Sequence, residues 1–171
     1  MANPDDVVTL IVQDETAPAD TVAVFAEAGL EPFLYQHEGG ADRGWPTLGE
    51  MIDAGQRLVV FAENEGPPPG WYHPAFAYIQ DTPFQFATPE DMSCEPNRGP
   101  PDVPLLLINH WLSPAAPDRR SAAIVNAHDV IVERARRCEA ERGQLANFIA
   151  VDFYGIGDVL GAVDTLNGLG D

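Results

Sequence analysis

Polar side chains that can bind a ligand or move a proton follow four short apolar runs of the chain. The runs span residues 7–12, 58–62, 105–108 and 148–151. The residues that follow them are Gln13 and Asp14, Glu63 and Asn64, Asn109 and His110 with Trp111, and Asp152. In parallel α/β folds, reactive groups gather at the carboxyl ends of buried strands, where the loops are free to vary. The sequence therefore predicts a functional site built from these strand ends.

The last apolar run offers the clearest setting for a carboxylate. Asp152 follows residues 148–151, and Gly155 and Gly157 punctuate the turn before an apolar helical pattern begins at Asp158. This is the layout of a buried strand that delivers a carboxylate to a strand-to-helix loop. Two roles stay open for Asp152: it orients a histidine, as triad carboxylates do, or it caps the turn that follows.

Helical patterns separate the apolar runs. They cover residues 18–28, 46–55, 118–137 and 158–166, and Gly29 and Gly55 are suited to end the first two helices. Each strand is too short and too apolar to be stable alone, so we expect the strands to lie side by side with the helices over them. The predicted fold class is α/β, with four main parallel strands.

Residues 64–104 form a proline-rich stretch that is long for a simple connection, so we expect a packed or functional excursion there. Its aromatic side chains are Trp71, Tyr72, Phe76, Tyr78, Phe84 and Phe86. One interpretation is that they give the excursion a small core of its own. The other is that they form a binding wall for a ring-shaped or lipidic ligand.

The composition is that of an acidic globular chain. Its 171 residues are 45% hydrophobic and include 27 Asp plus Glu against nine basic residues, all arginine, for a formal net charge of −18. This charge opposes binding to nucleic acid and to anionic lipid surfaces. No apolar stretch approaches the roughly 20 residues of a membrane span. The first residues also lack the basic and apolar regions of a signal peptide.

The two cysteines, Cys94 and Cys138, do not have the spacing of a zinc site. Cys94 lies in a loop rich in Pro and Gly, and Cys138 lies near the end of a predicted helix. These positions leave two possibilities, a pair of free thiols or one disulfide. A disulfide would indicate an oxidising compartment.

Five segments of the chain, in order, resemble one known family. They are WPTLGEMIDAGQRLVVFAEN, MSCEPNRG, LLLINHWLS, VNAHDVIVERARRCEAERG and NFIAVDFYGIGDVLGAVDTLNG. Together they look like the C-terminal half of the phosphatidylinositol-specific phospholipase C-like phosphodiesterases. The resemblance covers nearly the whole chain and implies a distorted TIM barrel, of which residues 1–171 are a single partial domain.

The resemblance also implies the chemistry, which is cleavage of a phosphodiester, such as a phospholipid head group, by general acid and base catalysis with two histidines. The family carries these histidines on the first barrel strands, in stretches resembling AHNS and HG, and neither stretch occurs here. The chain corresponds to the barrel from about its fourth strand. We therefore expect it to need the missing N-terminal half as a partner and to be inactive alone. The alternative is a non-enzymatic remnant or binding module.

Roles for individual residues follow from the resemblance alone. Asp152 and His110 would support catalysis, while His128 would be a surface residue. Gln13 stands where calcium-dependent relatives have a metal-binding glutamate, so a Ca²⁺ site would rest on Gln13 and Asp14. The residues expected to line the substrate site are Glu63, Asn64, Asn109, Trp111 and Tyr154, although a carboxylate at the first of these would repel phosphate.

Cys94 and Cys138 fall inside family-like motifs on either side of the NHW strand end. The resemblance therefore predicts that these two cysteines form a disulfide, and that the parent protein is exported. Closing a loop of this length contributes about 4 kcal/mol to the free energy of unfolding in the chain-entropy model.

Overall fold

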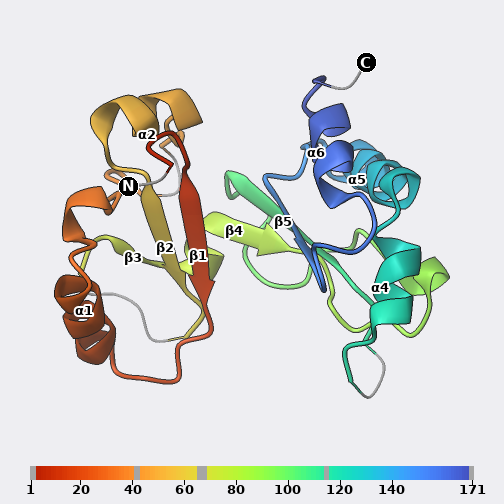
Figure 1. Ribbon diagram of the computed structural model, residues 1–171, viewed down its shortest axis with the longest axis horizontal. Coiled ribbons are helices and arrows are strands. Elements are labelled where there is room, and N and C mark those ends of the chain that lie inside the picture. The colour runs from red at the N-terminus through yellow and green to blue at the C-terminus, as the bar shows by residue number, and fades with distance from the viewer. Residues whose placement is uncertain (1–2, 41–42, 65–68, 114–115, 170–171) are drawn as a thin grey trace. The chain divides into compact units, whose positions relative to one another are not determined.

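The computed structural model describes residues 3–40, 43–64, 69–113 and 116–169 (Figure 1). The chain divides into two compact units. Unit 1 is Met1–Tyr78 with Asp102–Pro104, and unit 2 is Ile79–Pro101 with Leu105–Asp171. Each unit contains one three-stranded parallel sheet and its own helices. The α/β class with parallel strands is therefore confirmed, and its strands form two small sheets.

Unit 1 is built on the strands β1 (Val8–Val12), β2 (Leu58–Ala62) and β3 (Tyr72–Pro74), in the order β1-β2-β3. Its helices are α1 (Pro18–Glu27), α2 (Leu48–Ala54), α3 (Ala75–Tyr78) and the 3-10 turn η1 (Glu31–Phe33). All five residues of β2 are buried, which fits a central strand without polar alternation. Phe25 of α1 packs with Leu34, Val60 and Tyr72 in the core of this unit.

Local sequence signals set the ends of α2. The Thr47 hydroxyl accepts from the Glu50 amide, and the Glu50 carboxylate accepts from the Thr47 amide, so the helix begins with a capping box. Gly55 ends it with φ +71°, a left-handed conformation that residues with a side chain rarely adopt. β2 starts three residues later and carries the chain to the strand end that concerns function.

Unit 2 is built on the strands β4 (Ile79–Asp81), β5 (Leu105–His110) and β6 (Phe148–Val151), in the order β4-β5-β6. Its helices are α4 (Arg119–Val125), α5 (His128–Arg142), α6 (Val159–Leu166) and the 3-10 turn η2 (Pro89–Asp91). Ile108, Ala135 and Leu166 pack with the two cysteines in one core cluster, which joins β5 to α5 and α6.

The grouping of the strands differs from the expectation of four strands side by side. β1 pairs with β2 and β5 pairs with β6 as parallel neighbours, but the two pairs lie in separate sheets. The third strand of each sheet, β3 or β4, comes from the stretch that sequence reasoning treated as an excursion. Each of these strands has three residues, which is too short for a period-two pattern to show in the sequence.

The single helix predicted over residues 118–137 is wrong, because the structure breaks it at Asn126 and Ala127 into α4 and α5. The carbonyl groups of the last residue of α4 and of the first residue of the break bond elsewhere. That of Val125 accepts from the His110 ring, and that of Asn126 accepts from the Asp158 amide. A continuous helix would need these carbonyls for its own hydrogen bonds, so tertiary contacts override the helical pattern.

Candidate functional site

The ends of β1 and β2 are joined through Asp14. Its side chain is 2% exposed, and its Oδ1 accepts from the Asn64 amide at 2.8 Å. The Asn64 side chain returns the contact by donating from Nδ2 to the Asp14 carbonyl at 3.1 Å. The structure therefore brings together two of the predicted site residues, and their hydrogen bonds link the residues that follow β1 to those that follow β2.

Gln13 and Asp14, the residues of the predicted calcium site, differ in exposure, and the calcium site stays a prediction. Calcium takes six to eight oxygen ligands. Gln13 is exposed and Asp14 is buried, and one oxygen of the Asp14 carboxylate already accepts a backbone hydrogen bond. Within the described ranges, no three His, Cys, Asp or Glu side chains are grouped so that they could hold a metal ion.

Asp81, at the end of β4, anchors the corresponding region of unit 2. It is fully buried, and its carboxylate accepts from the Arg98 guanidinium at 2.6 and 2.9 Å and from the Arg98 amide at 2.7 Å. The side chains of Asn97 and Asn109 donate to the same carboxylate at 3.2 and 3.1 Å. A buried carboxylate needs such partners because burial without them is costly.

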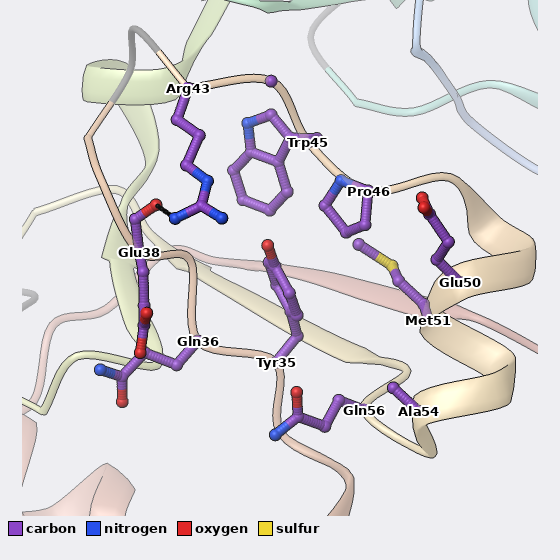
Figure 2. Close-up of a pocket in the computed structure, with 11 residues that line it drawn as sticks. Tyr35, Gln36, Glu38, Arg43, Trp45, Pro46, Glu50, Met51, Ala54 and Gln56 are labelled. Carbon is purple, nitrogen blue, oxygen red and sulfur yellow. Dashed lines mark hydrogen bonds between the residues drawn. The ribbon is translucent and has the colours of Figure 1, made fainter.

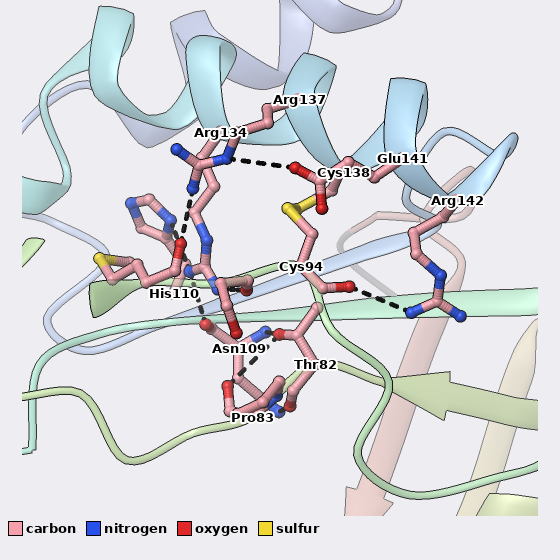
Figure 3. The surroundings of a disulfide bond; sticks show 12 residues. Thr82, Pro83, Cys94, Asn109, His110, Arg134, Arg137, Cys138, Glu141 and Arg142 are labelled. Carbon is pink, nitrogen blue, oxygen red and sulfur yellow. Dashed lines mark hydrogen bonds and ion pairs between the residues drawn. A yellow bond between two sulfur atoms is a disulfide. The ribbon is translucent and has the colours of Figure 1, made fainter. Parts of the chain in front are cut away.

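Asn109 and His110 are held from the other side by Arg134 of α5 (Figure 3). The Arg134 Nη1 donates to the Asn109 carbonyl at 2.7 Å and lies 3.2 Å from the His110 Nδ1. The His110 Nε2–H donates to the Val125 carbonyl at 2.7 Å, which leaves Nδ1 as the acceptor. Both strand-end residues are therefore fixed inside unit 2.

Burial of His110 favours its neutral form. The side chain is 1% exposed, and this desolvation, with a smaller contribution from the nearby Arg134 charge, lowers its pKa from 6.5 to about 4. The Val125 carbonyl opposes the shift only in part. Desolvation also lowers the pKa of Arg134 to about 10. At neutral pH, His110 is an uncharged structural link rather than a proton donor.

The disulfide between Cys94 and Cys138 fastens residues 92–94 to α5, and the Cα atoms are 5.1 Å apart (Figure 3). Three arginines of the same helix donate to consecutive carbonyl groups of this segment. The bonds run from Arg137 to Met92, from Arg134 to Ser93 and from Arg142 to Cys94. The segment is thus held by one covalent bond and three charge-assisted hydrogen bonds.

Asp152 lies at the end of β6 and is half-buried. Within the described parts of the chain its carboxylate has no hydrogen-bond partner, while its carbonyl accepts from the Asn126 side chain at 2.8 Å. The cap of α6 is Asp158, which accepts from the Gly161 amide. Next to Asp152, Tyr154 is 79% exposed.

The predicted residues fall into two groups, one in each unit. Gln13, Asp14, Glu63 and Asn64 belong to unit 1, and the remaining candidates belong to unit 2. Sequence reasoning missed Asp81, Arg98 and Arg134. Asp81 was missed because its strand, β4, has only two residues before it, too few to form an apolar run. Arg134 was missed because an arginine near the end of a helix is expected to interact with the helix dipole, not to be buried.

The aromatic residues of the 64–104 stretch pack inside the units. Tyr72 is fully buried, Phe86 is 4% exposed, and Trp71 lies 5.0 Å from Phe25 between ring centroids. Tyr78 meets the Trp45 ring edge-on at 5.6 Å. These contacts agree with the interpretation that the aromatic side chains supply packing.

Unit 1 also contains a hollow of about 800 Å³ (Figure 2). It is lined by Tyr35, Gln36, Glu38, Arg43, Gly44, Trp45, Pro46, Glu50, Met51, Ala54 and Gln56. The Tyr35 hydroxyl points toward the Trp45 ring, and burial raises its pKa while the Arg43 charge opposes the rise. The lining contains none of the predicted strand-end residues, so the hollow is separate from them.

Comparison with known proteins places these observations in a family. The family model described as PI-PLC X 1 matches residues 1–167. PI-PLC X domain-containing protein 1 of Arthroderma benhamiae is 29% identical over 98% of this chain and 61% of its own length. A PI-PLC X domain-containing protein of Arabidopsis thaliana is 27% identical over 97% of this chain and 41% of its own length. No solved structure matches the chain.

A further relative, named an uncharacterized secreted protein of Arthroderma benhamiae, is 29% identical over 94% of this chain and 42% of its own length. The chain therefore spans between 41% and 61% of these relatives. Of the helices in the described ranges, none has the length and apolar character needed to cross a bilayer. Because the family model extends over nearly every residue, the chain belongs to the PI-PLC X domain family.

Proposed function

We propose that the chain is the C-terminal part of a phosphoric diester hydrolase whose complete domain is a distorted TIM barrel. The substrate class is a phosphodiester, such as a phospholipid head group. In the complete domain, two histidines from the N-terminal half would act as general acid and base. The chain would contribute the supporting residues at its strand ends and part of the substrate wall, including Asn109, Trp111 and Tyr154.

The main support for placing the catalytic histidines in the N-terminal half is the hydrogen bonding of the four histidines of this chain. Both ring nitrogens of each one are within hydrogen-bond distance of a partner inside the structure. His37 contacts the Tyr35 hydroxyl and the Gly40 carbonyl, and His73 contacts the Val60 carbonyl and the His37 amide. His110 is bonded as described above, and His128 contacts Asp129 and Thr165.

This arrangement argues against an acid–base pair within the chain, because a catalytic imidazole needs a nitrogen that can reach the substrate. The surface position predicted for His128 agrees with its partial exposure, and its ring also makes two contacts. His128 is 35% exposed, and it links the start of α5 to α6 through Thr165. The catalytic pair is therefore expected in the N-terminal half of the family domain.

Asp152 is the best candidate for a direct role in the complete site. Its carboxylate lies at a strand end and accepts no hydrogen bond within the described parts of the chain, whereas the Asp14 carboxylate accepts from the Asn64 amide and that of Asp81 from Arg98. A free carboxylate there is suited to orient a histidine from the N-terminal half and to stabilise its imidazolium form. Glu63 is less suited to contact the substrate, since its charge would repel phosphate.

The test compares the isolated chain with the chain joined to a family N-terminal half, in trans or fused in frame. We expect no turnover of phosphatidylinositol or a chromogenic phosphodiester by the isolated chain, and restored turnover by the assembled halves. In the restored enzyme, Asp152→Asn should lower kcat by about 10²-fold. Glu63→Gln should have a smaller effect, and Asp164→Asn, on the exposed face of α6, serves as the control.

Robust turnover by the isolated chain, abolished by His110→Ala, would contradict the proposal. The competing possibility is a binding module without catalysis, which predicts that the assembled halves bind a phosphodiester but do not cleave it. The DNA sequence immediately upstream of the Met1 codon separates the two cases independently. An in-frame extension with two histidines at strand ends favours the enzyme, and a stop codon favours the module.

We also propose that the parent protein is exported. The Cys94–Cys138 disulfide is suited to an oxidising compartment, since cytosolic reductants keep most thiols reduced. One relative is named a secreted protein. Thiol labelling of the denatured, unreduced native protein should find no free cysteine, and two free cysteines would overturn the proposal.

A further inference from the structure

Asn126 lies at the break between α4 and α5 and bonds to both ends of the loop of residues 152–158, which carries Asp152. Its side-chain Nδ2 donates to the Asp152 carbonyl at 2.8 Å, and its own carbonyl accepts from the Asp158 amide at 2.9 Å. Asn126 is fully buried, so these contacts are shielded from water. Two hydrogen bonds from one residue therefore close the loop of residues 152–158.

The loop approaches Asn126 so closely that only glycine fits at position 157. Gly157 has φ +83°, and a Cβ at this position would collide with the Asn126 carbonyl oxygen and carbon. A residue with a side chain would meet both backbone strain and a steric clash. The glycine of the loop and the asparagine of the helix break thus form one contact.

The loop needs such an anchor because part of it is strained. Phe153 has φ +52°, a left-handed conformation that is uncommon for a residue with a bulky side chain. The Ile156 amide donates to the Phe153 carbonyl at 2.8 Å, which closes a tight turn. The Arg119 guanidinium lies 5.6 Å from the centre of the Phe153 ring. The surrounding structure must hold this turn in place.

Val125, the residue before Asn126, bonds to the end of the neighbouring strand β5. The Val125 carbonyl accepts from His110 at the end of β5, while Asn126 holds the loop after β6. The two carbonyls that a continuous helix would use internally therefore bond to His110 at the end of β5 and to Asp158 at the start of α6. This explains why the helix breaks here and what the break achieves.

We infer that Asn126 is the positioning residue of the Asp152 loop, and that it fixes where Asp152 and Tyr154 stand relative to the ends of β5 and β6. The functional part of this inference rests on the proposed hydrolase activity, because Asn126 would act through Asp152. The structural part does not, because it concerns the conformation of residues 152–158 in the chain as it stands.

The first arm of the test uses limited proteolysis with chymotrypsin, which cuts after aromatic residues such as Phe153 and Tyr154. Asn126→Ala should speed cleavage in the loop about tenfold, the factor that corresponds to about 1.4 kcal/mol. Asn147→Ala is the matched control, since the Asn147 side chain accepts from the Leu106 amide at the opposite end of β6. It should leave loop cleavage near the wild-type rate.

Gly157→Ala is a second variant that tests the same contact if Asn126→Ala fails to fold. It breaks the same contact from the loop side and should likewise speed cleavage. Gly168→Ala is its control, because Gly168 has a similar φ of +73° but open space around its position. Equal loop cleavage in Gly157→Ala and Gly168→Ala, or in Asn126→Ala and Asn147→Ala, would overturn the inference whatever the activity.

The second arm measures turnover by the assembled halves. Asn126→Ala should lower kcat about tenfold or more, since a displaced Asp152 weakens the chemical step, and should raise KM by a smaller factor, since a displaced Tyr154 weakens substrate binding. An unchanged kcat in a variant whose loop is released would refute the link to catalysis. Absence of turnover in the unmutated assembly would instead refute the proposed function and leave the proteolysis result standing.

Discussion

The two units of this chain end their strands in similar polar residues but hold them in different ways. In unit 1, Asp14 and Asn64 close on each other through two hydrogen bonds. In unit 2, Asp81 is neutralised by Arg98 and also receives hydrogen bonds from Asn97 and Asn109. The bonds between Asp14 and Asn64 thus join two strand ends, while Asp81 is the centre of a charged network.

Unit 2 also contains a disulfide, whereas the described residues of unit 1 contain none. The Cys94–Cys138 disulfide and three arginines of α5 fasten residues 92–94 to the helix. Most strand-end polar groups are therefore committed to holding loops in place. The Asp152 carboxylate has no hydrogen-bond partner in the described parts of the chain, which is why the comparison directs attention to it.

The largest expected effect concerns the disulfide, and it would sharpen the contrast between the units. Cys94 and Cys138 are 44 residues apart, so replacing both with serine should lower the free energy of unfolding by about 4 kcal/mol in the chain-entropy model. Amide hydrogen exchange should accelerate in β5 and β6 far more than in β2. Equal acceleration in all three strands would show that the units unfold together and would break the comparison.

The next effect compares the two buried carboxylates directly. Asp81→Asn removes the charge that faces Arg98, whose side chain is 33% exposed, and should cost about 3 kcal/mol, the low end for breaking a buried pair. Asp14→Asn keeps an oxygen that can accept from the Asn64 amide but removes the charge that strengthens this bond, and should cost about 1 kcal/mol. Urea unfolding of both variants provides the measurement. A larger loss for Asp14→Asn would mean that the network of unit 2 is not the stronger one.

Much of the fold could be predicted from the sequence where the signals are local. The apolar runs that became β1, β2, β5 and β6 are long enough to recognise, and the caps at Gly29 and Gly55 have the expected positive φ. β3 and β4 escaped prediction because each has three residues and lies among prolines and glycines. Their pairing depends on longer neighbours, β2 and β5, which no local pattern reveals.

The site was less predictable because it depends on contacts between distant residues. The sequence could nominate Asp14 and Asn109 as polar residues at strand ends, but it could not show that both would be consumed by internal hydrogen bonds. The helix break at Asn126 is the clearest case. Its neighbours have helical preference. The break follows from the bond of Val125 to His110, 15 residues away, and from the bond of Asn126 to Asp158, 32 residues away.

The last expected effect is a pH dependence that originates in His110. Its folded-state pKa, about 4, lies below the 6.5 expected in the unfolded chain, so the unfolded state binds more protons between these values. The stabilisation from the neutral ring is present above pH 6.5 and is lost as the pH falls toward 4. From about pH 7 to about pH 5, His110 should lower the free energy of unfolding by about 2 kcal/mol.

His110→Gln removes the titrating group while keeping a side chain that can donate to the Val125 carbonyl. Its free energy of unfolding, measured in urea at a series of pH values, should fall less steeply than that of the wild type between about pH 7 and pH 5. His73→Gln is the matched variant in unit 1, because burial also lowers the pKa of His73. Its effect has the same sign, and hydrogen exchange should locate it in β2 rather than in β5. Parallel pH curves for wild type and His110→Gln would show that His110 does not titrate as its burial requires, and the buried network of unit 2 would then have to accommodate a charged imidazole beside Arg134.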